Sequence, residues 1–303
     1  MPLTGDGHVH SEWSWDTGGP GSDAAGRMQA MCRRALKIGL PALAFTEHLD
    51  LTGWVIDPED LLDHLRPLVG DNGLLIPEPL DVAGYLESVE RCRRQFPELR
   101  ILSGVEFGQP HIDADKARQL VDLSALDRVN GSLHTLPISD ESGALRYEPI
   151  TLYRQWPAER VIWEYLAEAR RMIAGSDMYE VLSHIDYAVR YWPAQQEGPF
   201  NPRIFEDVFR LVMRDLAGSG RALELNVGGP LRPWIPQWWS EEGGRAITFA
   251  SDAHTTDALA NNFYEAMAMA EHFGFAKAVS RRTSGPADCA RWTVGWNQFY
   301  RGN

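Results

Sequence analysis

Cysteine is scarce in this chain of 303 residues, which has three: Cys32, Cys92 and Cys289. So few cysteines, lying far apart in the sequence, exclude a disulfide framework and a zinc site built from cysteine. Free cysteines of this kind suit a reducing compartment.

Long apolar runs are also missing. No stretch approaches the roughly 18 uncharged apolar residues that suggest a membrane span. The chain begins with the polar sequence MPLTGDGHVHSEWSWD, which does not resemble a secretory signal. We therefore expect a soluble protein of the cytoplasm with no membrane partner.

Positive charge is in deficit. Lys and Arg number 29 against 42 for Asp and Glu, so the net charge is −13 with neutral histidine. This balance argues against a protein that binds long nucleic acid, but it allows a cluster of carboxylates that bound cations neutralise. A P-loop, a nucleophile-elbow serine and a dinucleotide fingerprint are absent as well. The composition, 44% hydrophobic and 23% charged, is that of a globular domain.

Short apolar runs alternate with longer stretches of helical character. Seven runs predict strands at 3–10, 42–48, 101–108, 127–134, 179–185, 222–229 and 246–254. Apolar residues at helical spacing predict helices at 23–38, 81–95, 114–123, 158–174, 203–217 and 257–273. Repeated strand–helix units favour parallel strands joined by right-handed crossovers, in an open sheet or a closed barrel.

Potential metal ligands end almost every one of these runs, and this feature separates the two architectures. Only a closed or nearly closed ring brings the ends of so many strands to one centre. We therefore expect an α/β fold, a distorted (β/α)7 TIM-like barrel with its site at the C-terminal ends of the strands.

Residues 1–303 are expected to form a single domain. Two stretches, 49–80 and 136–157, are long for strand–helix connections, and they predict insertions that cover the mouth of the barrel. The last segment, 280–303, is rich in aromatic residues and is expected to pack on the body as a tail.

Two pairs of residues give the sharpest chemical signal. His8 and His10, like Asp252 and His254, stand two apart at a strand end, so each pair can reach one cation. A third signal is Glu106, a carboxylate that ends an apolar run and precedes Gly108. Each of these signals is weak by itself, because Asp252 could cap a helix and Glu106 could be a solvated strand-end residue. Repetition favours ligands, because six of the nine histidines fall at predicted strand ends: His8, His10, His48, His134, His184 and His254.

The candidate ligands are too many for one ion. Together with Asp16, Glu106 and Asp252, the six histidines exceed the roughly four ligands of a tetrahedral site. They suit two or three divalent ions with a bridging carboxylate, and Zn, Mn and Fe all accept imidazole and carboxylate. Ions roughly 3.5–4 Å apart act together in phosphoryl transfer.

Six segments, read together, resemble the successive motifs of the PHP (polymerase and histidinol phosphatase) superfamily: DGHVHSEWSWD, FTEHLD, SGVEFG, NGSLHT, LSHIDY and SDAH. The resemblance runs from about residue 6 to residue 254 and implies a seven-stranded distorted barrel with a trinuclear metal centre. An aspartate at position 16, where many members have histidine, is similar to the histidinol-phosphatase branch. The resemblance implies one ion on His8, His10, Glu106 and Asp252, a second on Glu106, His134 and His184, and a third on Asp16, His48 and His254.

The resemblance also implies an activity. It points to a metal-dependent phosphomonoesterase, foremost a histidinol-phosphate phosphatase that uses a metal-bridging hydroxide, with Glu106 and Asp252 acting in catalysis. Arg190 is expected to clamp the substrate phosphate, although it could equally be an exposed helix arginine. Ser14 and Asn226 are further expected substrate contacts.

Neighbouring polar residues complete the hypothesis. Asp6 and Glu47 are expected to orient imidazoles. Acidic residues of the two insertions are expected to meet the cationic groups of the substrate: Asp57, Glu59, Asp60, Asp140 and Glu141.

Two other functions stay open. One is a phosphoesterase for a nucleotide, an oligonucleotide end or another small phosphate ester. The other is a non-catalytic barrel that binds metal for structure. Both enzyme hypotheses take a small phosphate ester as partner, and the sequence leaves the oligomeric state open.

Overall fold

The computed structural model describes residues 2–138, 145–277 and 298–301. Nine strands form one sheet in the order β1-β2-β5-β6-β9-β10-β11-β13-β12. The first seven pair in parallel and follow the order of the chain. They are β1 (Asp6–Val9), β2 (Ala42–Leu49), β5 (Arg100–Gly108), β6 (Arg128–Ser132), β9 (Val181–Leu182), β10 (Ala222–Asn226) and β11 (Ala246–Ala250). The expected mixed α/β fold with parallel strands is confirmed.

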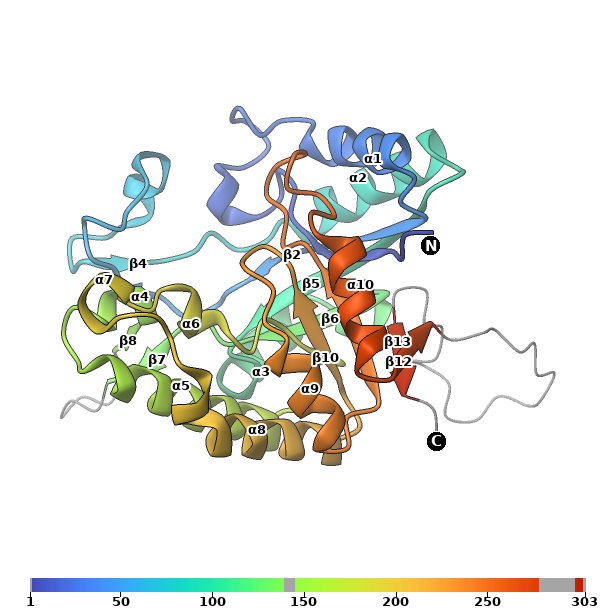
Figure 1. Cartoon of the computed structure of the whole chain (residues 1–303). Coiled ribbons are helices and arrows are strands. Elements are labelled where there is room, and N and C mark those ends of the chain that lie inside the picture. Colours follow the sequence, from blue (N-terminus) through green and yellow to red (C-terminus); the bar gives the residue numbers. More distant parts are fainter. Residues whose placement is uncertain (1, 139–144, 278–297, 302–303) are drawn as a thin grey trace.

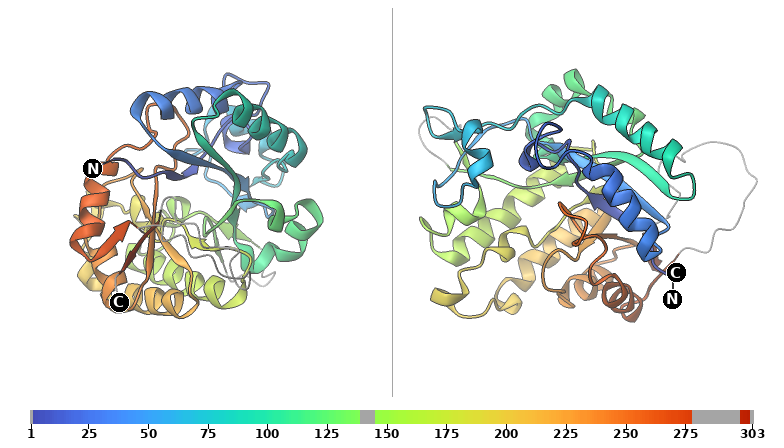
Figure 2. Two further views of the ribbon diagram at one scale, coloured as in Figure 1. Left: turned by 90° about the vertical axis from the view of Figure 1, so that its right-hand side faces the viewer. Right: turned by 90° about the horizontal axis from the view of Figure 1, so that it is seen from above.

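Helices separate these strands along the chain and surround the sheet on its outside (Figures 1 and 2). The six expected helices are confirmed, with ends that differ by a few residues. They are α1 (Arg27–Ile38), α2 (Val82–Gln95), α3 (Pro110–Leu120), α5 (Ala158–Gly175), α8 (Glu206–Gly218) and α10 (Phe263–His272). The sequence analysis did not predict α9 (Trp234–Glu241) or the short helices α4 (Pro149–Leu152), α6 (Tyr187–Arg190) and α7 (Ala194–Glu197).

Helix α1 illustrates how the sequence produces these elements. Its buried side chains, Met28, Met31, Cys32 and Ala35, recur at helical spacing and face the core. The helix ends at Gly39, whose φ of 75° is a left-handed conformation that glycine adopts without a steric penalty.

The sheet is curled, so that its first strand approaches the segment after β11 (Figure 2). The amide of His10 donates to the carbonyl of Ala253 at 3.0 Å, and the amide of Asp252 donates to the carbonyl of His8 at 2.9 Å. These two hydrogen bonds place the ends of β1 and β11 beside each other. The curl therefore brings together residues more than 240 positions apart in the sequence.

The two predicted insertions meet in a second, small sheet with the order β4-β3-β8-β7. Strands β3 (Trp54–Val55) and β4 (Leu74–Leu75) come from 49–80, and β7 (Leu136–Pro137) and β8 (Arg146–Tyr147) come from 136–157. Val55 pairs with Tyr147, which joins one insertion to the other. Strands of two residues carry no readable periodicity, so the sequence did not predict them.

The C-terminal part adds two antiparallel strands, β12 (Phe275–Lys277) and β13 (Gln298–Arg301), beyond β11. Phe299 is fully buried, and its ring lies 4.8 Å from that of Phe249. Most of the expected tail 280–303, including Trp292 and Trp296, lies outside the described residues.

Within the described ranges, every helix is too short or too polar to cross a bilayer.

Candidate metal centre

The nine predicted ligands meet at the carboxyl ends of the parallel strands. Eight lie in or just after β1, β2, β5, β6, β9 and β11, and Asp16 lies in a short 3-10 helix, η1 (Trp15–Thr17). Within the described part of the chain, four groups of side chains bring their ligand atoms within 4.8 Å of one another. They are His8, His10, Glu106 and Asp252; Glu106, His134 and His184; His10, His48 and His254; and His48, Asp50 and His134.

In the first group, His8 and His10 direct the lone pairs of their Nε2 atoms toward each other. Nδ1 of His8 lies 2.9 Å from the Glu224 carboxylate and donates its proton there, which leaves Nε2 of a neutral ring as a lone pair. Nδ1 of His10 lies 2.8 Å from Oγ of Ser14. That hydroxyl already donates to Glu47 at 2.7 Å, so it accepts from His10 and leaves Nε2 of that ring as a second lone pair.

These two Nε2 atoms lie 3.1 Å apart. Oε2 of Glu106 is 3.2 Å from the first and 3.4 Å from the second, and the Asp252 carboxylate lies at 3.6 and 3.3 Å from the two. Four acceptor atoms this close repel one another unless positive charge sits between them. The donor set therefore fits a divalent cation with imidazole and carboxylate ligands.

The pKa values of the two rings shift in opposite directions, because different charges surround them. Burial opposes protonation of His8, but the carboxylates of Glu106 and Glu224 outweigh it and raise its pKa well above the usual range. Burial, with the neighbouring His254 and His48, lowers the pKa of His10 to about 3. His10 thus keeps its lone pair at any physiological pH.

Glu106 divides its two oxygens between neighbouring groups. Oε2 faces His8 and His10, while Oε1 lies 3.0 Å from Nε2 of His134 and 2.7 Å from Nε2 of His184. A carboxylate in this position can hold two cations at once. Burial raises the pKa of Glu106, but the surrounding imidazoles outweigh burial and hold it well below the usual range.

Asp50, which the sequence analysis missed, orients His134. Its Oδ1 accepts from Nδ1 of His134 at 3.0 Å, so Nε2 points at Glu106. Gly108, at the end of β5, makes room for this contact, because a Cβ there would lie 1.9 Å from the Asp50 carboxylate. Asp50 stands two residues after His48, and this spacing, the same as between His8 and His10, could have revealed it.

The third predicted set lies nearest the solvent. Oδ2 of Asp16 lies 3.5 Å from Nε2 of His48 and 2.9 Å from Nε2 of His254. The side chains of Asp16 and His254 are 24% and 33% exposed, whereas that of His8 is fully buried. The rings of His10 and His254 stack at 4.1 Å, which links this set to the first group.

Asp252 and Arg190 form an edge of the centre that lines the adjoining cavity. Asp252 has a φ of 55°, a left-handed conformation that few residues other than glycine adopt and that functional sites often hold. Its Oδ2 accepts from Nη1 of Arg190 at 3.0 Å. Nη2 of Arg190 is buried and has no hydrogen-bond partner among the described residues. Arg190 therefore retains a donor for a ligand in the adjoining cavity.

Ser14 and Asn226 lie behind the ligands. Ser14 is fully buried between His10 and Glu47. Nδ2 of Asn226 donates to Glu224 at 2.9 Å and lies 3.5 Å from the Asp252 carboxylate. In this structure both side chains orient ligand residues.

Asp6 and Glu47 act differently from the expectation that they orient imidazoles. Asp6 accepts from the backbone amides of His8 and Ser251, so it fixes two strands rather than a ring. Glu47 accepts from Ser14 and reaches the imidazole of His10 only through that hydroxyl.

Glu224 in β10 and Glu148 after β8 are further site residues that the sequence analysis missed. The signal for Glu224 is a carboxylate inside the apolar run ALELN, where an unpaired charge would be costly to bury. Nothing in the sequence around Glu148 distinguishes it from a solvated glutamate.

A cavity of about 280 Å³ opens on the ligand groups. The insertions contribute Trp54, Asp60 and Glu148 to its wall, and Arg190 and Tyr187 of α6 also line it. Asp57 and Asp60 have a basic partner of their own, Arg154, and their expected contact with a substrate cation stays a prediction. The guanidinium of Arg154 lies 2.9 Å from Asp57 and makes two hydrogen bonds of 2.6 Å to Asp60. Asp140 and Glu141 lie outside the described residues.

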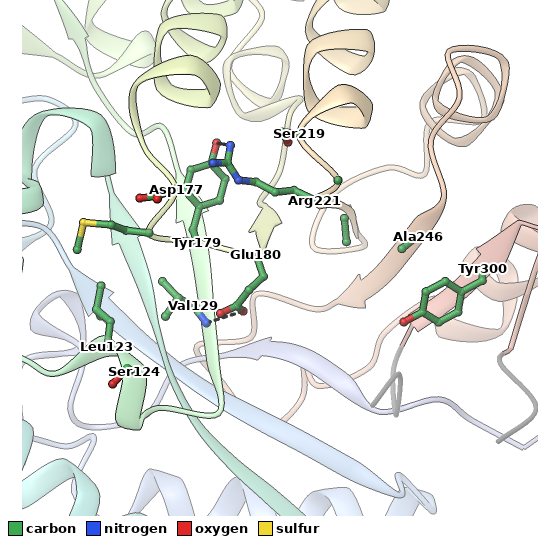
Figure 3. A pocket seen from close by; sticks show the side chains of 13 residues that line it. Leu123, Ser124, Val129, Asp177, Tyr179, Glu180, Ser219, Arg221, Ala246 and Tyr300 are labelled. Carbon is green, nitrogen blue, oxygen red and sulfur yellow. Dashed lines mark hydrogen bonds between the residues drawn. The ribbon is translucent and has the colours of Figure 1, made fainter. Parts of the chain in front are cut away.

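A larger cavity, of about 530 Å³, lies at the opposite ends of the strands, before β9, β10 and β11 (Figure 3). Two of its charged side chains, Arg221 and Glu180, already have partners. Arg221 donates to the carbonyls of Ile173 and Ser176 and stacks on Tyr179, and Glu180 accepts from the amide of Val129 at 3.0 Å. No candidate ligand group lies there among the residues described. The smaller cavity is therefore the candidate site.

Known proteins with similar sequences include histidinol-phosphatases. "Probable histidinol-phosphatase" of Clostridium acetobutylicum is 27% identical over 216 residues, which cover 66% of this chain and 82% of that protein. Histidinol-phosphatase of Lactococcus lactis subsp. lactis is 25% identical over 279 residues, or 89% of this chain and 91% of that protein.

A solved structure shares the fold. Histidinol phosphate phosphatase from Lactococcus lactis subsp. lactis Il1403, complexed with zinc, L-histidinol and phosphate, superposes with a TM-score of 0.71 at 21% identity. The match covers 90% of this chain and 94% of that one.

The family model described as the PHP domain matches residues 6–227, which hold seven of the nine predicted ligands; Asp252 and His254 follow the matched range. The match spans well over half of the chain and begins with the strand that carries His8. The chain belongs to the PHP domain family.

Proposed function

We propose that this chain is a metal-dependent phosphomonoesterase that hydrolyses L-histidinol phosphate to L-histidinol and phosphate. One observation carries the proposal. Lone pairs of imidazoles and carboxylates converge in buried groups, and beside them Nη2 of Arg190 has no hydrogen-bond partner within the described ranges. The relatives named histidinol-phosphatase support the choice of substrate.

The ligand groups would hold two or three divalent cations. His8, His10, Glu106 and Asp252 would hold one, Glu106, His134 and His184 a second, and Asp16, His48 and His254 a third. Zinc is our first choice because the Lactococcus structure contains it, with manganese and iron as alternatives. When bound, such cations polarise phosphoryl oxygens and make water acidic enough to supply hydroxide near neutral pH.

The protein side chains divide the remaining work. Glu106 and Asp252 would supply negative charge to the cations, and Asp252 also fixes one nitrogen of Arg190. Nη2 of Arg190 donates to a phosphoryl oxygen and stabilises the charge that develops on it. Glu224, Asp50 and Ser14 fix the tautomers of His8, His134 and His10.

We also propose a closed barrel and a single domain for this chain. The seven parallel strands form a distorted (β/α)7 TIM-like barrel, and residues 1–303 form one domain whose insertions 49–80 and 136–157 cover the mouth. The hydrogen bonds between β1 and the segment after β11 support closure. The pairing of Val55 with Tyr147 supports a joint cover.

The test is phosphate release by protein freed of metal and then supplied with Zn, Mn or Fe. The substrates are L-histidinol phosphate, p-nitrophenyl phosphate and a dinucleotide that carries a terminal phosphate. We expect kcat/KM for histidinol phosphate to exceed the others at least about tenfold, a difference of about 1.4 kcal/mol in transition-state binding. Equal turnover, or preference for the dinucleotide, would contradict the substrate. Metal binding without any turnover would favour a structural role.

A further inference from the structure

Six carboxylates line the cavity above the ligand groups: Asp16, Asp50, Asp60, Glu106, Glu148 and Asp252. Five of them have basic partners. Asp16, Asp50 and Glu106 face imidazoles, Asp60 is held by Arg154, and Asp252 is held by Arg190.

Glu148 is the exception. Among residues 2–138, 145–277 and 298–301, no hydrogen bond or ion pair engages its carboxylate. The backbone fixes its position, because Glu148 follows β8 and precedes Pro149, the first residue of α4. Burial raises the pKa of this carboxyl to about 7. The imidazoles of His134 and His48 oppose the shift, and the negative charges of Asp50 and Asp60 add to it. An acidic group in such a place gains most from a ligand that brings its own positive charge.

The surroundings of Glu148 suit an organic cation rather than another metal ion. Glu148 belongs to none of the ligand groups found in the described part of the chain. The neighbouring cavity wall is aromatic and contains Trp15, Trp54, Tyr187 and Tyr191. Aromatic faces beside a carboxylate are a common environment for ammonium groups and protonated rings. The phosphate end of a ligand would lie at Arg190, and Tyr187 lies close to that side, with the guanidinium carbon 5.5 Å from its ring.

We propose that Glu148 binds the positively charged nitrogen of the substrate's organic half and thereby selects phosphate esters of amino alcohols over uncharged esters. The inference rests on the proposed function and deepens it, because it assigns recognition of the leaving group to one side chain. Glu148 is a specificity residue in this account, and the phosphoryl chemistry does not depend on it.

The experiment compares Glu148→Gln with the wild type on two substrates. L-Histidinol phosphate carries a cationic organic half, and p-nitrophenyl phosphate carries an uncharged one. For the first we expect kcat/KM to fall about 10- to 100-fold, mainly through KM, because a buried charge pair is lost. For the second we expect a change of less than about twofold, and metal content stays the same.

Two further variants keep the result interpretable. Glu148→Asp retains the charge on a shorter side chain, so its loss on histidinol phosphate should be smaller than that of Glu148→Gln. Glu159→Gln, at an exposed position in the first turn of α5, is the matched control and should leave both substrates unchanged.

The outcomes separate the two proposals. If the wild type prefers histidinol phosphate but Glu148→Gln loses equally on both substrates, or on neither, the role of Glu148 is overturned and the proposed function stands. Loss of metal from Glu148→Gln would also overturn it. If the wild type shows no preference for histidinol phosphate, the proposed function fails and this inference fails with it.

Discussion

The two ends of the parallel strands carry cavities of opposite character. The larger one, at the amino ends, contains Arg221 and Glu180, whose polar atoms bond to backbone groups and to Tyr179 (Figure 3). The smaller one, at the carboxyl ends, contains imidazole nitrogens and carboxylate oxygens that face one another. Volume alone would have selected the other end. Unbalanced charge, not empty space, marks the candidate site in this molecule.

The largest effect on activity is expected for Glu106→Gln, at the carboxyl ends of the strands. The amide cannot supply negative charge to two groups, so activity should fall at least about 10³-fold and more than one ion per chain should be lost. Phosphate release and elemental analysis of the same sample measure both effects. Full activity with full metal content would contradict the role of Glu106 as a bridge between two ions.

Arg190→Ala tests the N–H donor at Nη2 of Arg190, which has no partner among the described residues. Without the guanidinium, kcat/KM should fall about 10²- to 10³-fold, because a donor to the developing phosphoryl charge is gone. Metal content should stay the same, since Arg190 only contacts a ligand residue. Arg214→Ala on α8, whose side chain is 63% exposed, is the matched control. Metal loss in Arg190→Ala would assign this arginine to support of Asp252.

Glu224→Ala tests orientation at the carboxyl end. Removing the partner of Nδ1 frees the ring of His8 to rotate and change tautomer, so metal affinity should fall about 10- to 100-fold. Metal titration with an indicator dye measures the affinity. An unchanged affinity would mean that packing alone holds the imidazole.

The smallest effect on activity is expected at the amino ends of the strands, where Glu180→Gln should leave kcat/KM unchanged. Its effect is on stability. Burial raises the pKa of Glu180 from 4.5 to about 7, so the folded protein binds this proton more tightly than the unfolded chain. The wild type therefore loses stability relative to Glu180→Gln as the pH rises from about 4.5 to 7, by at most about 3 kcal/mol. Urea unfolding at pH 5 and pH 8 measures this difference, and a parallel pH dependence of the two proteins would contradict it.

Periodicity predicted the long elements of the fold but not the small sheet. The stripe of Met28, Met31 and Ala35 specified α1, and the runs around Phe45 and Val105 specified β2 and β5. The expected strand 179–185 shrinks to Val181–Leu182, and β3 and β8 have two residues each. Tertiary pairing between the insertions, rather than local preference, forms such strands.

The candidate ligands were predictable because imidazoles recur at strand ends, a pattern that requires no knowledge of distances. Their supporting groups were less so. The position of Asp50 depends on the space at Gly108, and the proposed role of Glu148 depends on its having no partner among the described residues. Likewise, Arg154 donates a hydrogen bond to Asp60, a residue 94 positions away in the sequence. Sequence shows which residues could carry charge, whereas only the fold shows which charges are already paired.

Stepwise return of zinc to metal-free protein, with phosphate release from L-histidinol phosphate followed at each addition, tests the central claim most directly. We expect no turnover without metal and a rate that rises and levels off between about two and three equivalents per chain. Turnover in the metal-free protein equal to that of the loaded protein would contradict the account.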